Sequence, residues 1–176
     1  EVESVVDGVY AIPEGAFYDK IALIKCVLPD KLERIETNAF ALTSLSGSVL
    51  LPEGLKYVSG FYLTKITNVQ FPSTIEEIGK QAFSDCTSLM CEVSFPESLK
   101  IIGQNAFSRS GIKGNLSLPH NLEQIGVSAF NNCASLTGSL AIPDKITEIP
   151  RDAFYGTGFT GTLTLPAGLN EIGMYA

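Results

Sequence analysis

The side chains of this sequence that could perform chemistry are few and isolated. The single histidine, His120, follows a proline in an expected turn, and no recurrent Cys, Ser or carboxylate accompanies it as a general base or metal ligand would require. Glu76 and Glu77 are adjacent carboxylates, but neighbours in an extended segment point to opposite faces. The chain has no Gly-rich phosphate loop, no His-Glu-x-x-His motif and no zinc-type set of Cys and His. We therefore expect no enzyme activity, no metal and no cofactor.

The four cysteines could form disulfides, but their spacing argues against it. Cys86 and Cys133 occupy equivalent places in units two apart. Equivalent atoms of such units would lie roughly 10 Å apart, beyond the Cα separation of ~7 Å that a disulfide tolerates. Cys26 and Cys91 take strand and linker positions, and only Cys86 with Cys91 is close enough in sequence to consider. We expect four free cysteines, three of them small core residues.

The elements that would position any functional group form a tandem repeat. Prolines recur at intervals of 20 to 24 residues, each within the same apolar pattern. They are Pro29, Pro52, Pro72, Pro96, Pro119, Pro143 and Pro166. A period in this range means that each unit is too small to bury its own apolar face and must stack on its neighbours. The sequence therefore predicts a repeat solenoid.

Each unit contains three elements. An alternating segment before the proline, such as Leu116-Ser-Leu-Pro119, predicts a strand, and a segment with apolar ends, such as Leu122-Glu-Gln-Ile-Gly126, predicts a second, shorter one. An Ala-Phe pair then follows, and its Phe lies eleven residues after the proline in almost every unit. We expect these rings to stack as a phenylalanine spine in the core. The interval from Pro52 to Phe61 is only nine residues, so this coil should be pinched.

The repeats predict one elongated domain over residues 1–176. Residues 1–25 form a partial N-terminal unit, because Ile12-Pro-Glu-Gly-Ala-Phe17 matches Ile149-Pro-Arg-Asp-Ala-Phe154. About six repeats of 20 to 24 residues follow from residue 26 on. Ala176 falls on the Ala of the Ala-Phe pair, so we expect the last repeat to be truncated. Such an end would leave apolar positions and a strand edge unpaired, which favours end-to-end self-association.

The repeat resembles the BspA-type leucine-rich repeats of surface proteins from oral and gut anaerobes and some parasitic protists. The motif Leu-x-Leu-Pro-x-x-Leu-x-x-Ile-Gly-x-x-Ala-Phe-x-x-Cys-x-x-Leu, best seen from Leu116 to Leu136, carries the resemblance. The resemblance implies a right-handed leucine-rich repeat array, α/β by convention but mostly β, with parallel strands and short helical or 3₁₀ turns at the Ala-Phe pairs. It also implies a bacterial cell-surface or secreted protein that adheres to host proteins, host cells or other microbes.

Composition and charge exclude other classes. The chain is 45% apolar and 18% charged, which suits a filled core, and its apolar runs are too short to span a membrane. A net charge of −7 with scattered basic residues argues against nucleic acid. One position of the second element alternates in charge through successive units, and it reads Glu33, Lys56, Glu76, Lys100 and Glu123. This pattern predicts a ladder of exposed salt bridges.

The candidate binding face is the outward side of the strands that precede the prolines. Side chains there are small and polar, and they could dock an extracellular or host protein, or a glycan, by hydrogen bonds. The face comprises Asn68, Glu92, Ser94, Asn115, Ser117, Ser139, Thr162 and Thr164. Ser and Thr also suit exposed strands without any ligand. The sequence leaves these two interpretations open.

A second candidate is an aromatic patch in the pinched unit. Tyr57 and Tyr62 lie close in sequence and could stack against a sugar, although tyrosines packed at a repeat edge would look the same. The sequence therefore predicts a non-catalytic binding module for adhesion or protein–protein interaction. The alternative is a carbohydrate-binding or scaffolding module of a surface assembly.

Overall fold

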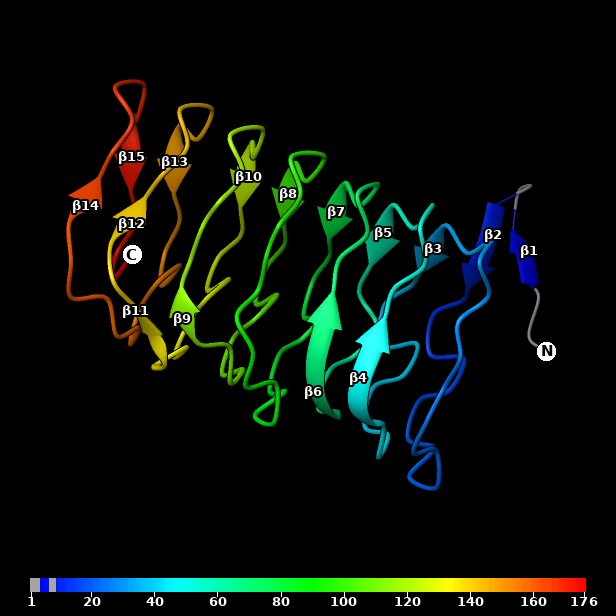
Figure 1. Ribbon diagram of the computed structural model, residues 1–176. Helices are drawn as coiled ribbons and strands as arrows, with labels where there is room; N and C mark the ends of the chain where they lie inside the picture. Colours follow the sequence, from blue (N-terminus) through cyan, green and yellow to red (C-terminus); the bar gives the residue numbers. More distant parts are fainter. Residues whose placement is uncertain (1–3, 7–8) are drawn as a thin grey trace.

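The protein is a solenoid of stacked coils, each of which contributes strands and turns to a shared interior (Figure 1). The computed structural model describes residues 4–6 and 9–176. One apolar cluster runs through the array, from Ile12 in the first coil to Phe154 near the other end. The predicted solenoid is confirmed, and its strands pair in parallel from coil to coil.

The strands are short and lie on two sides of each coil (Figure 1). They are β1 (Ser4–Val6), β2 (Val9–Ile12), β3 (Arg34–Ile35), β4 (Ser46–Leu50), β5 (Tyr57–Val58), β6 (Lys65–Gln70), β7 (Glu77–Ile78), β8 (Ile101–Ile102), β9 (Gly114–Asn115), β10 (Gln124–Ile125), β11 (Leu136–Thr137), β12 (Leu140–Ala141), β13 (Glu148–Ile149), β14 (Leu163–Thr164) and β15 (Glu171–Ile172). The antiparallel pair β1–β2 begins the array, and β2 pairs in parallel with β3. Of the predicted N-terminal unit, residues 1–3 and 7–8 lie outside the described residues.

The second elements, not the segments before the prolines, build the continuous sheet. Strands β1, β2, β3, β5, β7, β8 and β10 form one seven-stranded sheet, and β13 pairs separately with β15. The segments before the prolines are joined only in pieces, as β4–β6, β9–β11, β12–β14 and an isolated bridge from Ser94 to Ser117. The second elements are short, as expected, but their regular Leu-x-x-Ile spacing lets the coils from β3 to β10 repeat the same hydrogen bonds.

The prediction of a helical or 3₁₀ turn at the Ala-Phe pairs is wrong. No helix forms in the described part of the chain, and these segments are irregular turns. In the coil of Phe107 the reason is visible, because Asn105 and Arg109 on either side adopt left-handed backbone angles, with φ of 55° and 54°. Residues two before and two after the other spine rings repeat this conformation in most coils. A left-handed residue interrupts the right-handed run that a helix needs.

The phenylalanine spine is present as predicted. Seven rings stack in a column, with neighbouring centroids 5.2 to 5.6 Å apart and ring planes within 13° of parallel. The column is Phe17, Phe40, Phe61, Phe83, Phe107, Phe130 and Phe154. Phe61 keeps its place although its unit is short. The irregularity appears instead in the β4–β6 pair, whose register shifts between Gly47 and Ser48.

The charge ladder is also present. Lys56 reaches back to Glu33 and Lys100 to Glu76, each with an N to O distance of 2.8 Å. The hydrogen bond from Lys100, followed by its positive charge, lowers the pKa of Glu76, and the same contact raises the pKa of Lys100. Because these side chains are exposed to solvent, the pairs add little to the free energy of folding. The ladder favours the correct register more than it adds stability.

Two of the cysteines belong to a polar column beside the spine. Cys86 donates its thiol hydrogen to the carbonyl oxygen of Phe61, and Cys133 donates to that of Phe107, both with 3.0 Å between heavy atoms. Thr64 fills the equivalent position in its own coil and also donates to Phe61, at 2.9 Å. All four cysteines are free, as expected from the spacing of the units. Cys and Thr therefore recur here because a small side chain with a donor must satisfy a buried carbonyl.

We predict that Phe107→Ala destabilises the protein by about 3 to 5 kcal/mol, because its ring is fully buried between two neighbours in the spine. Chemical denaturation followed by circular dichroism measures the change. Ser117→Lys is the matched control, since Ser117 is exposed. A loss below about 1 kcal/mol for Phe107→Ala would contradict the role of the spine.

We predict that two of the four thiols react slowly in the native protein. Burial raises the pKa of Cys86 and Cys133 to about 11, so both are neutral and shielded at pH 8. Cys26 and Cys91 are only partly buried and should react first with Ellman's reagent. Release of all four equivalents without denaturant would show that the interior is open to solvent.

Candidate functional site

The predicted polar face lies where the sequence places it, on the outside of the strands before the prolines. Ser94, Ser117 and Thr164 are exposed, while the residues one place before them in the inner coils, such as Val93 and Leu116, are buried. The period of two along a strand produces this alternation. The remaining members, Glu92, Asn115, Ser139 and Thr162, are exposed, and Asn68 is half-buried. We call these eight residues the polar strip.

The structure brings members of the polar strip side by side in neighbouring coils. Ser94 bridges to Ser117 in a parallel arrangement, and Thr164 pairs with Ala141. Asn68 pairs with Ser48 in the coil on its other side. The strip is therefore a row of short side chains that runs along the solenoid axis and crosses several coils. A surface of this kind suits an extended contact rather than a deep pocket.

Some residues of the polar strip also make contacts between neighbouring coils of the solenoid. Ser139 accepts a hydrogen bond on its Oγ from the backbone amide of Thr162, 2.9 Å away in the next coil. Asn115 and Glu92 lie over glycines of the following coil, where a Cβ on Gly138 would stand 3.0 Å from Asn115 Oδ1 and one on Gly114 2.8 Å from Glu92 Cγ. Both glycines have φ near +80°. These contacts give Ser139 and Asn115 a structural role beside any role in binding.

A groove of about 560 Å³ opens at the N-terminal end of the polar strip. It is lined by Glu53, Asn68, Val69, Gln70, Phe71, Ser73, Glu92, Ser94 and Pro96. The lining thus unites three of the predicted residues, Asn68, Glu92 and Ser94, with others that the sequence pattern did not single out. No Lys or Arg lines the groove, although two carboxylates do. The site is acidic and polar, with one half-buried aromatic ring, Phe71.

The groove exists because β6 does not join the next coil. No backbone hydrogen bond links residues 65–71 to residues 92–96 in the part of the chain that the structure describes. Phe71 and Phe95, at equivalent inward positions of the two coils, touch with their centroids 5.6 Å apart, and Phe71 also meets Phe83 edge-on. Two bulky rings thus stand where other coils have Leu or Ile. An unpaired, six-residue strand edge faces the groove as a result.

Glu53 is held in place at the rim of the groove. Its carboxylate accepts hydrogen bonds from the amide of Ser73 at 3.3 Å and from the Ser73 hydroxyl at 2.9 Å. Neither Glu53 nor Glu92 forms an ion pair with any described residue. Two carboxylates without a cation at one groove favour a ligand that carries positive charge.

The predicted aromatic patch does not form a platform. Tyr57 lies in β5, where the guanidinium of Arg34 stacks on its ring at 4.2 Å from the centroid. Tyr62 follows the spine residue Phe61, in the turn, and is half-buried. The two tyrosine rings make no contact with each other. The ring of Tyr57 is thus covered by Arg34, and the two tyrosines offer no shared surface on which a sugar could stack.

The residues considered for catalysis remain apart. His120 is exposed on its turn, and its Nδ1 lies 3.2 Å from Glu97 Oε1 in the preceding coil. The hydrogen bond with His120 lowers the pKa of the Glu97 carboxyl group. Among the described residues, no Ser hydroxyl or Cys thiol bonds to the imidazole, and no group of three His, Cys, Asp or Glu side chains is arranged to hold a metal. Nor does any described helix have the length and apolar character to cross a membrane.

The chain is similar to known repeat proteins in both sequence and fold. The family model of the BspA type leucine-rich repeat region matches residues 10–113 and 57–176, with six copies. The crystal structure of a leucine-rich repeat protein of T. pallidum is 27% identical, with a TM-score of 0.64 over 96% of this chain and 69% of that one. A leucine-rich repeat protein from Bacteroides ovatus ATCC 8483 is 20% identical, with a TM-score of 0.47 over 95% and 67% of the two chains. No curated protein matches this sequence.

Proposed function

Because the chain belongs to the BspA-type leucine-rich repeat family, we propose that it is a non-catalytic module that binds another protein through the polar strip and its groove. The observation that carries the proposal is the groove beside β6, which collects Asn68, Glu92 and Ser94 at an unpaired strand edge. Repeat arrays present such extended surfaces to partners without forming a deep pocket. The family is one of repeat proteins suited to protein–protein interaction.

The chemistry of the groove suggests what the partner presents there. Glu53 and Glu92 lack cationic partners among the described residues, and Phe71 offers part of an aromatic face. A Lys or Arg side chain of the partner would be attracted to both carboxylates, and an Arg would also stack on Phe71. The partner surface is therefore basic at this point and polar along the rest of the strip.

The biological setting of this binding is part of the same proposal. The module acts in adhesion, at a cell surface or in a secreted protein, and its partner is an extracellular or host protein. What supports this setting is the resemblance of the repeat to the BspA-type repeats of surface proteins from host-associated microbes. Glycan recognition receives less support from the geometry, because Tyr57 is covered by Arg34 and the groove is lined by one half-buried ring.

We predict that charge and bulk introduced on the polar strip abolish specific binding without unfolding the protein. A panel of extracellular-matrix proteins and a glycan array are screened with the wild type and with the triple variant Ser94→Lys, Ser117→Lys, Thr164→Lys. Glu92→Lys, which reverses one groove charge, should weaken binding by about tenfold or more, equivalent to ~1.4 kcal/mol. Biolayer interferometry measures the affinities.

Gln104→Lys is the matched control, because Gln104 is exposed and is not part of the polar strip. It should leave binding unchanged. The proposal fails if the triple variant binds the same protein as tightly as the wild type. Binding confined to the glycan array would instead favour the carbohydrate-binding alternative.

A further inference from the structure

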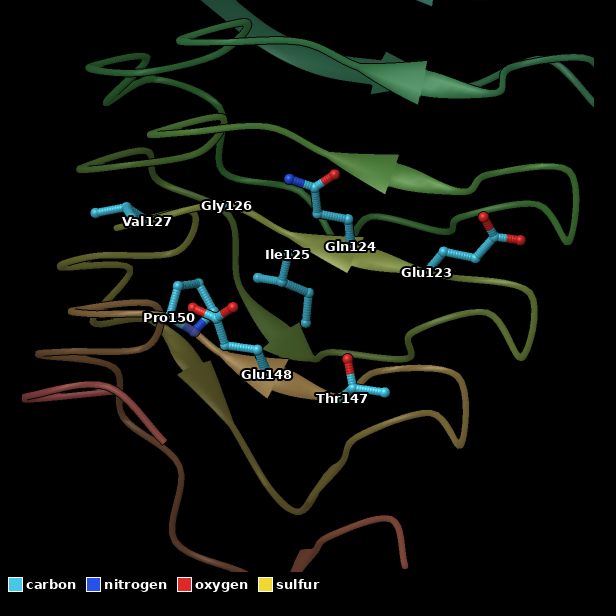
Figure 2. Close-up of a pocket in the computed structure, with 8 residues that line it drawn as sticks. All are labelled: Glu123, Gln124, Ile125, Gly126, Val127, Thr147, Glu148 and Pro150. Atoms are coloured by element: carbon cyan, nitrogen blue, oxygen red, sulfur yellow. The ribbon is translucent and has the colours of Figure 1, made fainter. Parts of the chain in front are cut away.

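The continuous sheet of the solenoid is interrupted between β10 and β13 (Figure 2). β10 is the last strand of the seven-stranded sheet, and β13 begins a separate pair with β15. A cavity of about 340 Å³ lies at the break and is lined by Glu123, Gln124, Ile125, Gly126, Val127, Thr147, Glu148 and Pro150. We call this break the seam. It lies on the sheet of second elements and not on the polar strip.

The cause of the seam is Pro150. In the coils on either side the equivalent residue is a glycine, and its amide donates to the preceding coil, as Gly103 does to Ile78 and Gly126 to Ile102, both at 2.7 Å. Proline has no amide hydrogen to donate. The position is also crowded, since a Cβ on Gly103 would stand 2.8 Å from the carbonyl carbon of Gly79. Pro150 therefore removes one hydrogen bond and adds atoms where the coils would otherwise touch.

The seam leaves backbone groups of both walls without partners. Within residues 4–6 and 9–176, no backbone amide donates to the carbonyl oxygen of Glu123 or Ile125, and the amide of Thr147 donates to none. In the regular coils the corresponding groups are paired, as when Lys100 donates to Glu76 at 2.9 Å. One wall thus offers acceptors and the other a donor. Both edges of an extended peptide carry N–H and C=O groups in alternation, so one edge can donate to the carbonyls of the first wall while the other edge accepts from the amide of the second.

The rim of the seam is acidic. Glu123 and Glu148 extend from its two walls (Figure 2). Lys145 approaches Glu123 at 3.6 Å, with both side chains about half exposed, and Glu148 forms no ion pair with a described residue. Basic side chains on an inserted segment would therefore be attracted to the rim, whereas acidic ones would be repelled.

The two coils remain joined directly beside the seam. The rings of Phe130 and Phe154 stack at 5.5 Å, and the amide of Phe130 donates to Ala153 at 2.8 Å. Ser128 likewise donates to Arg151 at 3.0 Å. An additional strand requires the coils to separate at the seam by ~4.8 Å while these contacts hold. Widening breaks no backbone hydrogen bond to the carbonyl oxygens of Glu123 and Ile125, because neither is paired there, but it separates Lys145 from Glu123 and Asn121.

We propose that the seam is a second interaction site, at which an extended, basic segment of a partner protein adds as a strand between β10 and β13. Its backbone donates to the carbonyls of Glu123 and Ile125 and accepts from the amide of Thr147. Its Lys or Arg side chains lie beside Glu123 and Glu148. The proposal is independent of the polar strip, so either site can fail without the other.

The test uses the chain with the acetylated and amidated peptide Lys-Val-Lys-Val-Lys as the probe. In the free protein the amide of Thr147 should exchange with deuterium much faster than that of Asn170, which donates to Thr147 at 2.8 Å. Saturation with the peptide should slow exchange at Thr147. The same peptide with N-methylated valines, or with glutamate in place of lysine, should bind at least about tenfold more weakly, because it lacks donors or carries the wrong charge.

Pro150→Gly supplies the decisive variant. It restores the missing amide, so the seam should close: exchange at Thr147 should slow without peptide, the melting temperature should rise, and peptide affinity should fall by about tenfold or more. This loss cannot be attributed to unfolding. Glu148→Lys should weaken binding while the seam stays open. Equal peptide affinity in the wild type and Pro150→Gly, or slow exchange of Thr147 in the free wild type, would overturn the proposal.

Discussion

Every coil of this protein depends on its neighbours for an interior. A unit of 20 to 24 residues contributes one spine phenylalanine, and each inner ring is covered by the ring above and the ring below at 5.2 to 5.6 Å. No coil could bury such a ring alone. The buried hydrogen-bond donors beside the spine also depend on stacking. The tight turns leave carbonyl oxygens such as that of Phe61 in the apolar interior, and Thr64 and Cys86, from two neighbouring coils, donate hydrogen bonds to it. Repeating one solution in every coil makes the apolar interior continuous along the axis of the array.

Sites arise where the repetition fails. Side-chain packing continues through the whole spine, but hydrogen bonding between coils is interrupted beside β6 and again at Pro150. At the first interruption two large rings, Phe71 and Phe95, occupy adjacent inward positions. At the second, a proline replaces a glycine that lies against the preceding coil. Both leave polar backbone exposed at a groove whose rim carries carboxylates. These two interruptions each place a groove beside carboxylates on the surface.

The sequence predicted the repeating parts well and the exceptions poorly. The spine, the free cysteines, the charge ladder and the exposure of Ser94, Ser117 and Thr164 all follow from the fixed period, because equivalent residues occupy equivalent places. The Ala-Phe turns were expected to be helical. The left-handed residues that flank them are mostly Asn, Asp, Gln, Ser, Arg or Leu and only rarely glycine, so no local signal marks them. The groove had a weak signal in Phe71, and the seam had one in Pro150, where neighbouring units have glycine.

The sequence alone therefore determined the architecture. The repeat period, the regularly spaced apolar residues of the core and the outward polar residues all follow from spacing along the chain. Only the tertiary structure decided which set of strands forms a continuous sheet and where strand pairing stops. It also decided which polar residues face a groove rather than open solvent. The physical reason is that hydrogen bonds between coils join residues about one repeat apart, and whether they form depends on how closely the two backbones approach. That approach is set by how Pro150, Phe71 and Phe95 pack against neighbouring coils, and linear spacing does not encode packing.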